Sequence, residues 1–240
     1  MDGKQRQFYL DAFGIQLWVP RRGEALPEEH PEPDRPPDRG VAADEPGGAE
    51  VSPSASTAGA WQRLGEQVRQ CRACPLWETR TQTVFGVGDP SADWLVIGEA
   101  PGAEEDRQGE PFVGRAGKLL NEMLFAIGLA REQVFIANVI KCRPPKNRDP
   151  RPEETAACSG FLQQQIALIE PKVMLVVGRI AAQNLLRTDR PIGKLRGRIW
   201  HWGDARIPVV VTYHPAYLLR SPLEKRKAWA DLQLAKSLVV

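Results

Sequence analysis

The sequence predicts an α/β protein, namely a three-layer α/β/α sandwich with a central four-stranded, mainly parallel sheet. Two observations predict this class. Four short apolar runs, rich in β-branched residues, are typical of strands buried on both faces, at 94–98, 134–140, 173–178 and 207–214. Stretches with helical character separate these runs, and strands that alternate with helices pair in parallel.

Four helices are expected between and after the strands. Residues 117–128 place apolar side chains at helical spacing and end at a glycine. Residues 152–169 open with Pro152 at the first helical position and carry two acidic residues in the first turn. Residues 179–187 and 225–238 complete the set. Ligands of such sheets bind beyond the carboxyl ends of the strands, so the segments that follow strands are the candidates for a site.

Composition divides the chain into three parts. Residues 20–60 hold eight prolines with many Ala, Gly and acidic residues, which predicts a disordered linker. Residues 1–19 contain a short apolar segment, for which two interpretations stay open: docking on the protein's own body, or binding to a repair or replication partner. The folded domain is expected over 61–240.

Charge and hydropathy limit the classes of function. No stretch approaches the roughly 20 apolar residues that span a bilayer, and the first residues lack a secretion signal, so we expect a cytoplasmic monomer. Residues 61–240 carry 26 basic and 19 acidic side chains, whereas residues 1–60 are acidic. A basic body fits a polyanion such as DNA, although many soluble domains are as basic without binding one.

The four cysteines form one pattern: Cys71 and Cys74 in a CxxC pair, then Cys142 after the second strand and Cys158 in the following helix. Thiolates are soft ligands that suit zinc or iron–sulfur clusters. Zinc usually takes two compact knuckles, so the wide spacing of the second pair favours a four-thiolate cluster. Zinc, or four unrelated buried thiols, are the alternatives.

Two segments that follow strands carry candidate chemistry. Residues 98–102, GEAPG, predict a tight turn whose amides could bind an anion or a carbonyl oxygen. His214 at the end of the last strand can donate to a developing anion, and the apolar residues after it, beside Arg220, can wedge into a duplex. Phe112 is either presented to a ligand or packed on the core. His201 is expected in a β-hairpin.

In combination, these residues resemble the family 4 uracil-DNA glycosylases, the iron–sulfur branch of the uracil-DNA glycosylase superfamily. The resemblance runs from about Cys71 to Leu238. It is carried by the ordered cysteines and by CRACPL, GEAPGAEEDRQGEPFVGRAGKLL, NVIKCRPPKNRDPRPEE, VVGRIAAQNLL and HPAYLLR.

The resemblance implies a role for each matching residue. It implies a 4Fe–4S cluster, mainly structural, on Cys71, Cys74, Cys142 and Cys158. It implies a first motif that holds the uracil and the attacking water, with Gly98, Glu99 and Ala100. Some relatives have a water-activating Asp where this chain has Ala100, so Glu99 is our first candidate for orienting the water, ahead of Glu105 and Asn147.

The remaining roles concern the flipped base and the DNA. By resemblance, Phe112 stacks on the base, Asn138 reads the uracil edge, and His214 lies beside uracil O2. Leu218 matches the intercalating wedge. Arg220 lies beyond it on the DNA-facing loop, and Asn147 is also expected to contact DNA.

The implied function is a monofunctional glycosylase that flips uracil out of DNA and hydrolyses its N-glycosidic bond, leaving an abasic site for base excision repair. The partner is uracil-containing DNA, single- or double-stranded. A related branch traps DNA covalently through a His that this chain lacks between Arg107 and Phe112, so we expect turnover. A non-enzymatic iron–sulfur module and a zinc-stapled hydrolase are the alternatives.

Overall fold

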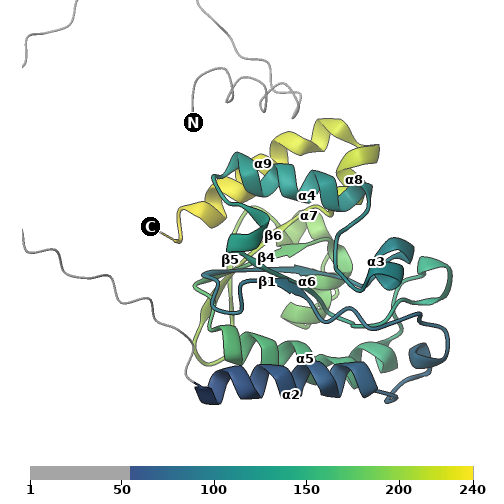
Figure 1. The fold of residues 1–240 in the computed structure, drawn as a ribbon. Coiled ribbons are helices and arrows are strands. Elements are labelled where there is room, and N and C mark those ends of the chain that lie inside the picture. The colour runs from purple at the N-terminus through teal and green to yellow at the C-terminus, as the bar shows by residue number, and fades with distance from the viewer. Residues whose placement is uncertain (1–54, 240) are drawn as a thin grey trace, which may run out of the picture.

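The computed structural model describes residues 55–239 (Figure 1). The predicted apolar segment 1–19, and the predicted linker as far as residue 54, lie outside the described residues. The first described helix, α2 (Ala55–Gln70), begins before Trp61, where the sequence placed the start of the domain. The Trp61 ring makes edge contacts with Phe85 and Phe135, with centroids 5.1 and 5.0 Å away, so α2 packs on the body.

The sheet has six strands in the order β1-β3-β2-β4-β6-β5. The four predicted strands are its parallel centre, and two antiparallel strands flank them at the edges. The prediction of four strands was therefore incomplete. The bounds are β1 (Val87–Gly88), β2 (Trp94–Gly98), β3 (Phe135–Asn138), β4 (Val173–Val177), β5 (Ile199–Trp202) and β6 (Ile207–Thr212).

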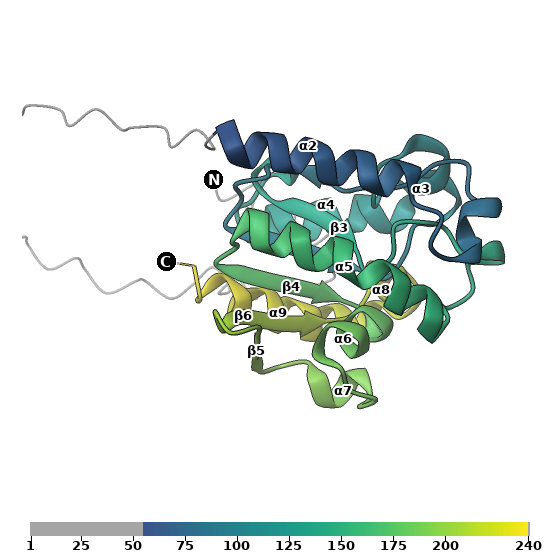
Figure 2. The same cartoon turned by 90° about the horizontal axis from the view of Figure 1, so that it is seen from below.

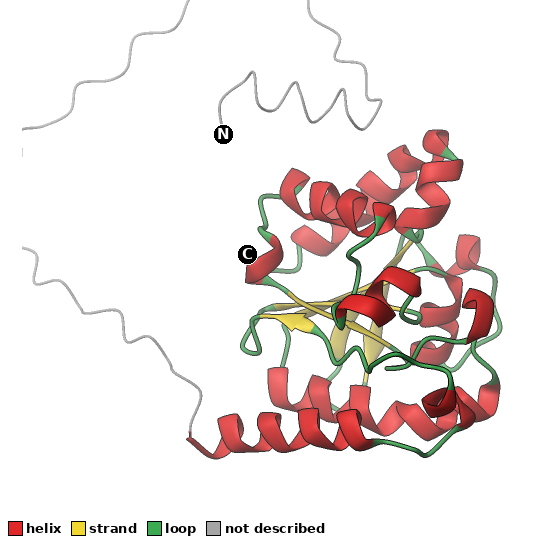
Figure 3. Cartoon of the chain, turned by 45° about the vertical axis from the view of Figure 1, so that its right-hand side comes forward, coloured by secondary structure: helices red, strands yellow, loops and turns green. Residues whose placement is uncertain are grey.

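Helices cover both faces of this sheet, which confirms the three-layer sandwich (Figure 3). Helices α2 and α5 lie side by side on one face (Figure 2), whereas α4, α8 and α9 lie on the other. The remaining bounds are α3 (Ala103–Gln108), α4 (Arg115–Ala126), α5 (Pro152–Ile169), α6 (Arg179–Leu186), α7 (Ile192–Leu195), α8 (Pro215–Arg220) and α9 (Lys225–Lys236), with short 3-10 turns η1 (Pro75–Glu78), η2 (Arg131–Gln133), η3 (Pro145–Asn147) and η4 (Pro222–Glu224).

The strands are apolar on both sides because each side faces a helical layer. In β2, Leu95 and Ile97 pack into the core under α5 and α6, whereas Trp94 and Val96 pack into the core under α4 and α9. Alternate residues of a strand point to opposite faces, so a doubly covered strand needs a continuous apolar run. Within residues 55–239, no helix has the length and apolarity needed to cross a membrane.

Parallel pairing brings the carboxyl ends of the central strands to one edge of the sheet. Gly98 at the end of β2 lies in register with Asn138 at the end of β3. Val177 of β4 lies in register with Thr212, two residues before His214. The segments that the sequence singled out therefore converge at this edge.

Candidate active site

A cavity of about 620 Å³ opens at the carboxyl edge of the sheet. Its walls come from the loop after β2, the end of β3, the η3 loop and the start of α8. Eight of the residues that the sequence singled out line it: Glu99, Ala100, Glu105, Phe112, Asn138, Asn147, His214 and Arg220. A larger groove of about 720 Å³ lies between α5, α6 and β5, but it contains none of these residues.

Asn138 and Phe112 line the cavity and meet behind its lining at Gly98, the last residue of β2. A Cβ atom on Gly98 would lie 2.4 Å from Asn138 Oδ1 and 2.6 Å from Phe112 Cζ, so only glycine fits there. The Asn138 side chain is buried, and its Oδ1 has no hydrogen-bond partner among the described residues. Buried polar atoms are normally paired, so this oxygen is available to a ligand.

Phe112 is held in a strained conformation. Its φ of 56° lies in the left-handed region, which a bulky residue rarely adopts. Arg131 donates to the carbonyl oxygens of Pro111 (2.6 Å) and Phe112 (3.4 Å). A Cβ on Gly117 would lie 1.7 Å from the Phe112 carbonyl oxygen, so this glycine lets α4 approach the loop. The strain and its supports fix the ring at the cavity wall.

Glu105 supports the same loop from the other side. Its Oε1 accepts hydrogen bonds from the backbone N–H groups of Val113 (3.1 Å) and Gly114 (3.3 Å). A carboxylate that is committed to backbone donors is poorly placed to orient water, so this geometry favours Glu99 over Glu105 for that role.

His214 is a neutral donor in this site. Its Nδ1 accepts a hydrogen bond from Ala216 N (3.1 Å) at the start of α8. Burial, and then the charge of Arg220, lower the pKa of His214 to about 4. A neutral ring that accepts at Nδ1 carries its proton on Nε2. The ring stacks on Phe112, with centroids 5.6 Å apart and planes 28° apart.

Glu99 is the carboxylate whose acidity is most changed at the cavity. Burial, and then the nearby Asp149, raise the pKa of Glu99 to about 7, and Arg179 opposes this shift. Arg179 itself donates to Asp149 at 3.0 Å. A carboxylate that titrates near neutral pH is suited to hold a water molecule or to accept its proton.

The four cysteines line a separate, small cavity. Cys71 and Cys74 come from the loop after α2, Cys142 from the segment after β3, and Cys158 from α5. All four are free thiols. Within residues 55–239, no group of three or more His, Cys, Asp or Glu side chains is arranged to hold a metal ion.

Two donors already point at the sulfur atoms. Arg80 Nη1 lies 3.0 Å from Cys142 Sγ, and the backbone N–H of Lys141 donates to Cys158 Sγ at 3.3 Å. Burial raises the pKa of the Cys158 thiol to about 11, and the Lys141 ammonium lowers it. Donors of this kind stabilise negative charge on sulfur, as metal–thiolate sites require.

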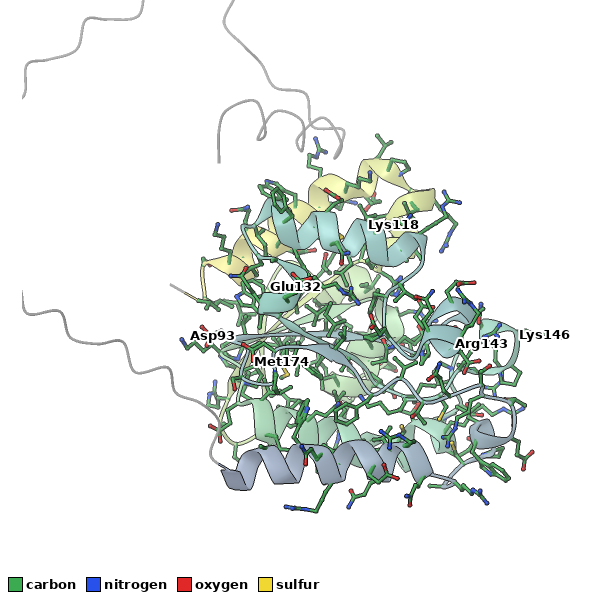
Figure 4. All side chains as sticks on the ribbon, viewed as in Figure 1. Asp93, Lys118, Glu132, Arg143, Lys146 and Met174 are labelled. Carbon is green, nitrogen blue, oxygen red and sulfur yellow. The ribbon has the colours of Figure 1, made fainter. Side chains whose placement is uncertain are left out.

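Figure 4 labels two acidic and two basic residues at opposite edges of the sheet. Asp93 and Glu132 lie at the edge where β2 and β3 begin. Arg143 and Lys146 lie at the opposite edge, beside the cavity. Two basic side chains that suit a phosphate backbone therefore lie beside the cavity, whose lining holds both acidic and basic residues.

A comparison with known protein families identifies the family to which the chain belongs. The model of the family described as the uracil DNA glycosylase superfamily matches residues 85–233. The chain belongs to the uracil DNA glycosylase superfamily.

Within this superfamily, the chain is similar to proteins named type-4 uracil-DNA glycosylase. It is 45% identical to the one from Archaeoglobus fulgidus over 174 residues, which cover 70% of this chain and 87% of the relative. The one from Thermotoga maritima is 44% identical over 179 residues, which cover 73% and 93%. A type-5 uracil-DNA glycosylase of Thermus thermophilus is 36% identical over 133 residues, which cover 49% and 59%. The family 4 resemblance is confirmed.

The structure contradicts the wedge role that this family resemblance implied for Leu218. Leu218 is 0% exposed and packs into the core beside α4. The HPAYLLR segment forms helix α8, and Pro215 and Leu218, three positions apart, occupy its inward face. Tyr217 and Leu219 occupy the outward face, and each is 37% exposed.

Sequence reasoning missed several residues that build this glycosylase-family site. Arg131, nineteen positions after Phe112, and Gly117, in the first turn of α4, support the Phe112 loop. Gly178, with a φ of +99°, would place a Cβ 3.1 Å from the Cβ of His214, so it lets the histidine approach β4. Lys141 lies under the cavity floor. The quoted motifs contained Gly117, Gly178 and Lys141, but spacing alone gave them no role.

Proposed function

We propose that this protein is a monofunctional uracil-DNA glycosylase that flips uracil out of DNA, hydrolyses its N-glycosidic bond and leaves an abasic site for base excision repair. The observation that carries the proposal is the convergence of the Asn138 side chain, whose Oδ1 has no partner among the described residues, a neutral His214 and the Phe112 ring at one cavity. The names of the type-4 relatives agree with it.

The cavity floor suits the edge of uracil. The amide of Asn138 donates from Nδ2 to uracil O4, and its Oδ1 accepts the uracil N3–H. Cytosine presents the reverse pattern, a donor at position 4 and an acceptor at N3. A mismatched amide pairing leaves buried groups unpaired, which costs about 1–3 kcal/mol per group. Phe112 stacks on the face of the extruded base.

The chemical step is heterolytic cleavage of the bond between the sugar carbon and uracil N1. The bonding electrons leave with the base, so negative charge develops on uracil, including O2. The Nε2–H of His214 and the backbone amides of the 98–102 turn stabilise this charge. A water molecule held by the Glu99 carboxylate then adds to the cationic sugar carbon and gives up its proton to that carboxylate.

Residues around the mouth hold the DNA. We place Arg220 and Asn147, both exposed, against the backbone, with Arg143 and Lys146 beside them. Because Leu218 is buried, we propose that Tyr217 and Leu219 on the outward face of α8 fill the space that the flipped base leaves.

We also propose that the four cysteines hold a 4Fe–4S cluster. The donor set consists of four soft thiols, and N–H donors already point at two of the sulfur atoms. When bound, the cluster would serve as a staple between the α2 loop, the end of β3 and α5.

Three expectations stay predictions: that the protein acts as a monomer, that it works in the cytoplasm, and that the apolar segment within residues 1–19 docks on the body or on a repair partner. The whole proposal is tested by incubating the purified protein with labelled single- and double-stranded oligonucleotides that contain one uracil. We expect release of free uracil with turnover. Folded protein that binds the DNA but releases no uracil would instead support a non-enzymatic module.

Replacing Glu99 with glutamine should change the pH dependence of excision. The pKa of Glu99 is raised to about 7, so in the wild-type protein its carboxylate becomes ionised, and kcat rises, as the pH increases through about 7. Glu99→Gln should lower kcat by about 10-fold to 100-fold and remove this rise. The measurement is kcat between about pH 5 and about pH 9.

The matched control is Glu122→Gln, an exposed acid on α4, which should keep the wild-type profile. A Glu99→Gln variant that still shows the rise near pH 7 would show that another group titrates there.

Replacing Cys142 with serine should remove the cluster. We expect loss of the broad absorbance near about 400 nm, loss of iron and sulfide, and a thermal midpoint lower by several degrees, since the staple is lost. Ser159→Ala, next to Cys158 but lining the groove between α5, α6 and β5, is the control and should keep the colour. Stoichiometric zinc and no colour in the wild-type protein would contradict the cluster.

A further inference from the structure

Lys141 is a buried cation directly under the floor of the cavity. Its side chain is 1% exposed. Its Nζ donates to the backbone oxygen of Asn138 at 2.9 Å and to Gln165 Oε1 at 2.6 Å. Both partners are neutral oxygens. Neither hydrogen bond is to a carboxylate, and the nearby Cys158 sulfur is the group whose charge favours the ammonium. A buried ammonium is costly, so the two directed hydrogen bonds of Lys141 point to a positioning role for it.

The hydrogen bond from Lys141 Nζ fixes the backbone carbonyl group of Asn138. After Asn138, the chain is tied to β2 through its N–H groups: Val139 N donates to Gly98 O at 2.9 Å, and Ile140 N donates to Glu99 O at 3.2 Å. Lys141 Nζ holds the Asn138 carbonyl from below. The peptide plane that follows Asn138 is thus held at both ends, and with it the direction of the Asn138 side chain.

Lys141 is itself held from α5. Gln165, which is fully buried, accepts from Lys141 Nζ and donates from Nε2 to Phe85 O at 2.9 Å. The backbone N–H of Lys141 donates to Cys158 Sγ, and Cys158 lies on the same face of α5 as Gln165, two turns earlier. Lys141 therefore lies between the helix that carries a cysteine of the cluster site and the amide that faces the base.

We propose that Lys141 is a positioning residue for base recognition, which acts through the Asn138 carbonyl to hold the Asn138 amide in the plane of the extruded base. The inference rests on the base-reading role proposed for Asn138. It goes further, because it states that Lys141 and Gln165, in addition to strand β3, hold the Asn138 amide in its orientation. Base discrimination, which depends on amide geometry, should then be lost without loss of DNA binding.

Lys141→Met keeps the length of the side chain and removes its donors. We expect kcat for uracil to fall by about tenfold or more, with KM within about threefold of wild type, because the lost interaction matters most in the transition state. The ratio of uracil to cytosine excision, each opposite guanine, should fall as well. Iron content and absorbance near about 400 nm serve as readouts of the cluster site and should stay at wild-type level.

Gln165→Met should also lower kcat with little change in KM, but by a smaller factor. In this variant Lys141 Nζ keeps its hydrogen bond to the Asn138 carbonyl oxygen and loses only the one to Gln165. Gln164→Met, an exposed neighbour on α5, is the matched control and should behave as wild type. If Lys141→Met does not fold, Gln165→Met decides: a wild-type uracil-to-cytosine ratio in that variant overturns the proposal.

Asn138→Ala separates the inference from the function on which it rests. If Asn138→Ala loses base discrimination but Lys141→Met keeps it, the positioning role is wrong and the proposed function stands. If Lys141→Met lowers only the thermal midpoint, the role is structural and the proposal is likewise overturned. If Asn138→Ala keeps full discrimination, the base-reading assignment fails and the positioning role fails with it.

Discussion

Replacing His214 with alanine should lower kcat for uracil excision by about 10²–10³-fold, the usual cost of losing a donor aimed at a developing anion. The Nδ1 atom of His214 is occupied by Ala216 N, so Nε2 carries the proton. Its pKa of about 4 keeps the ring neutral at physiological pH, and a neutral donor at Nε2 can point at O2 without placing a full charge in the empty cavity. DNA binding should change by less than about threefold, because the interaction forms mainly in the transition state.

The control for this variant is His201→Ala. His201 lies exposed on β5, outside the cavity, so its replacement should leave kcat unchanged. Equal losses of kcat and of DNA affinity in His214→Ala would contradict the electrostatic role.

The pH profile gives a second check on His214. Burial depresses its pKa from 6.5 to about 4, so the ring gains a proton only at a pH well below neutrality. In the Glu99→Gln background, where the titration near pH 7 is removed, kcat should stay flat as the pH falls to about 5. A fall in kcat near pH 6.5 in that background would mean that His214 titrates as an exposed histidine does.

The fold was predictable wherever local chemistry and tertiary packing agree. Helix α5 begins at Pro152 and ends at Ile169, as expected, because proline at the first turn and acids beside it favour a helix start that the core also requires. Strand β1 has two residues, and β5 alternates between exposed and partly buried side chains, so neither carries the continuous apolar run of a doubly covered strand.

The site was predictable as a set of residues but not as a geometry. The quoted motifs led to Asn138, Phe112 and His214, which do lie together. Leu218 is buried because residues 215–220 form helix α8 and this helix packs on α4. The contact between α8 and α4 is tertiary, so the sequence motif did not reveal it. Arg131 reaches Phe112 across nineteen positions of sequence, and no local pattern encodes that pairing.

Replacing Asn138 with aspartate should lower the rate of uracil excision by about 10³-fold or more, as expected when a site built around specific donors loses one of them. An ionised carboxylate only accepts, so it repels uracil O4 where the amide donated. The buried site raises the pKa of a carboxyl group, and a protonated aspartate can donate to cytosine N3 and accept from its amino group. Slow excision of cytosine should therefore appear as uracil excision falls.

Asn184→Asp is the matched control, because Asn184 is a partly buried asparagine on α6 whose side chain donates to Ile180 O outside the cavity. It should keep the wild-type rate and the wild-type preference for uracil. The Asn138 variant is measured by release of each base from otherwise identical duplexes. Asn138 Oδ1 is buried with no partner among the described residues, so it is the expected acceptor for the uracil N3–H. An unchanged preference for uracil in Asn138→Asp would mean that another group pairs with the N3 edge of the base.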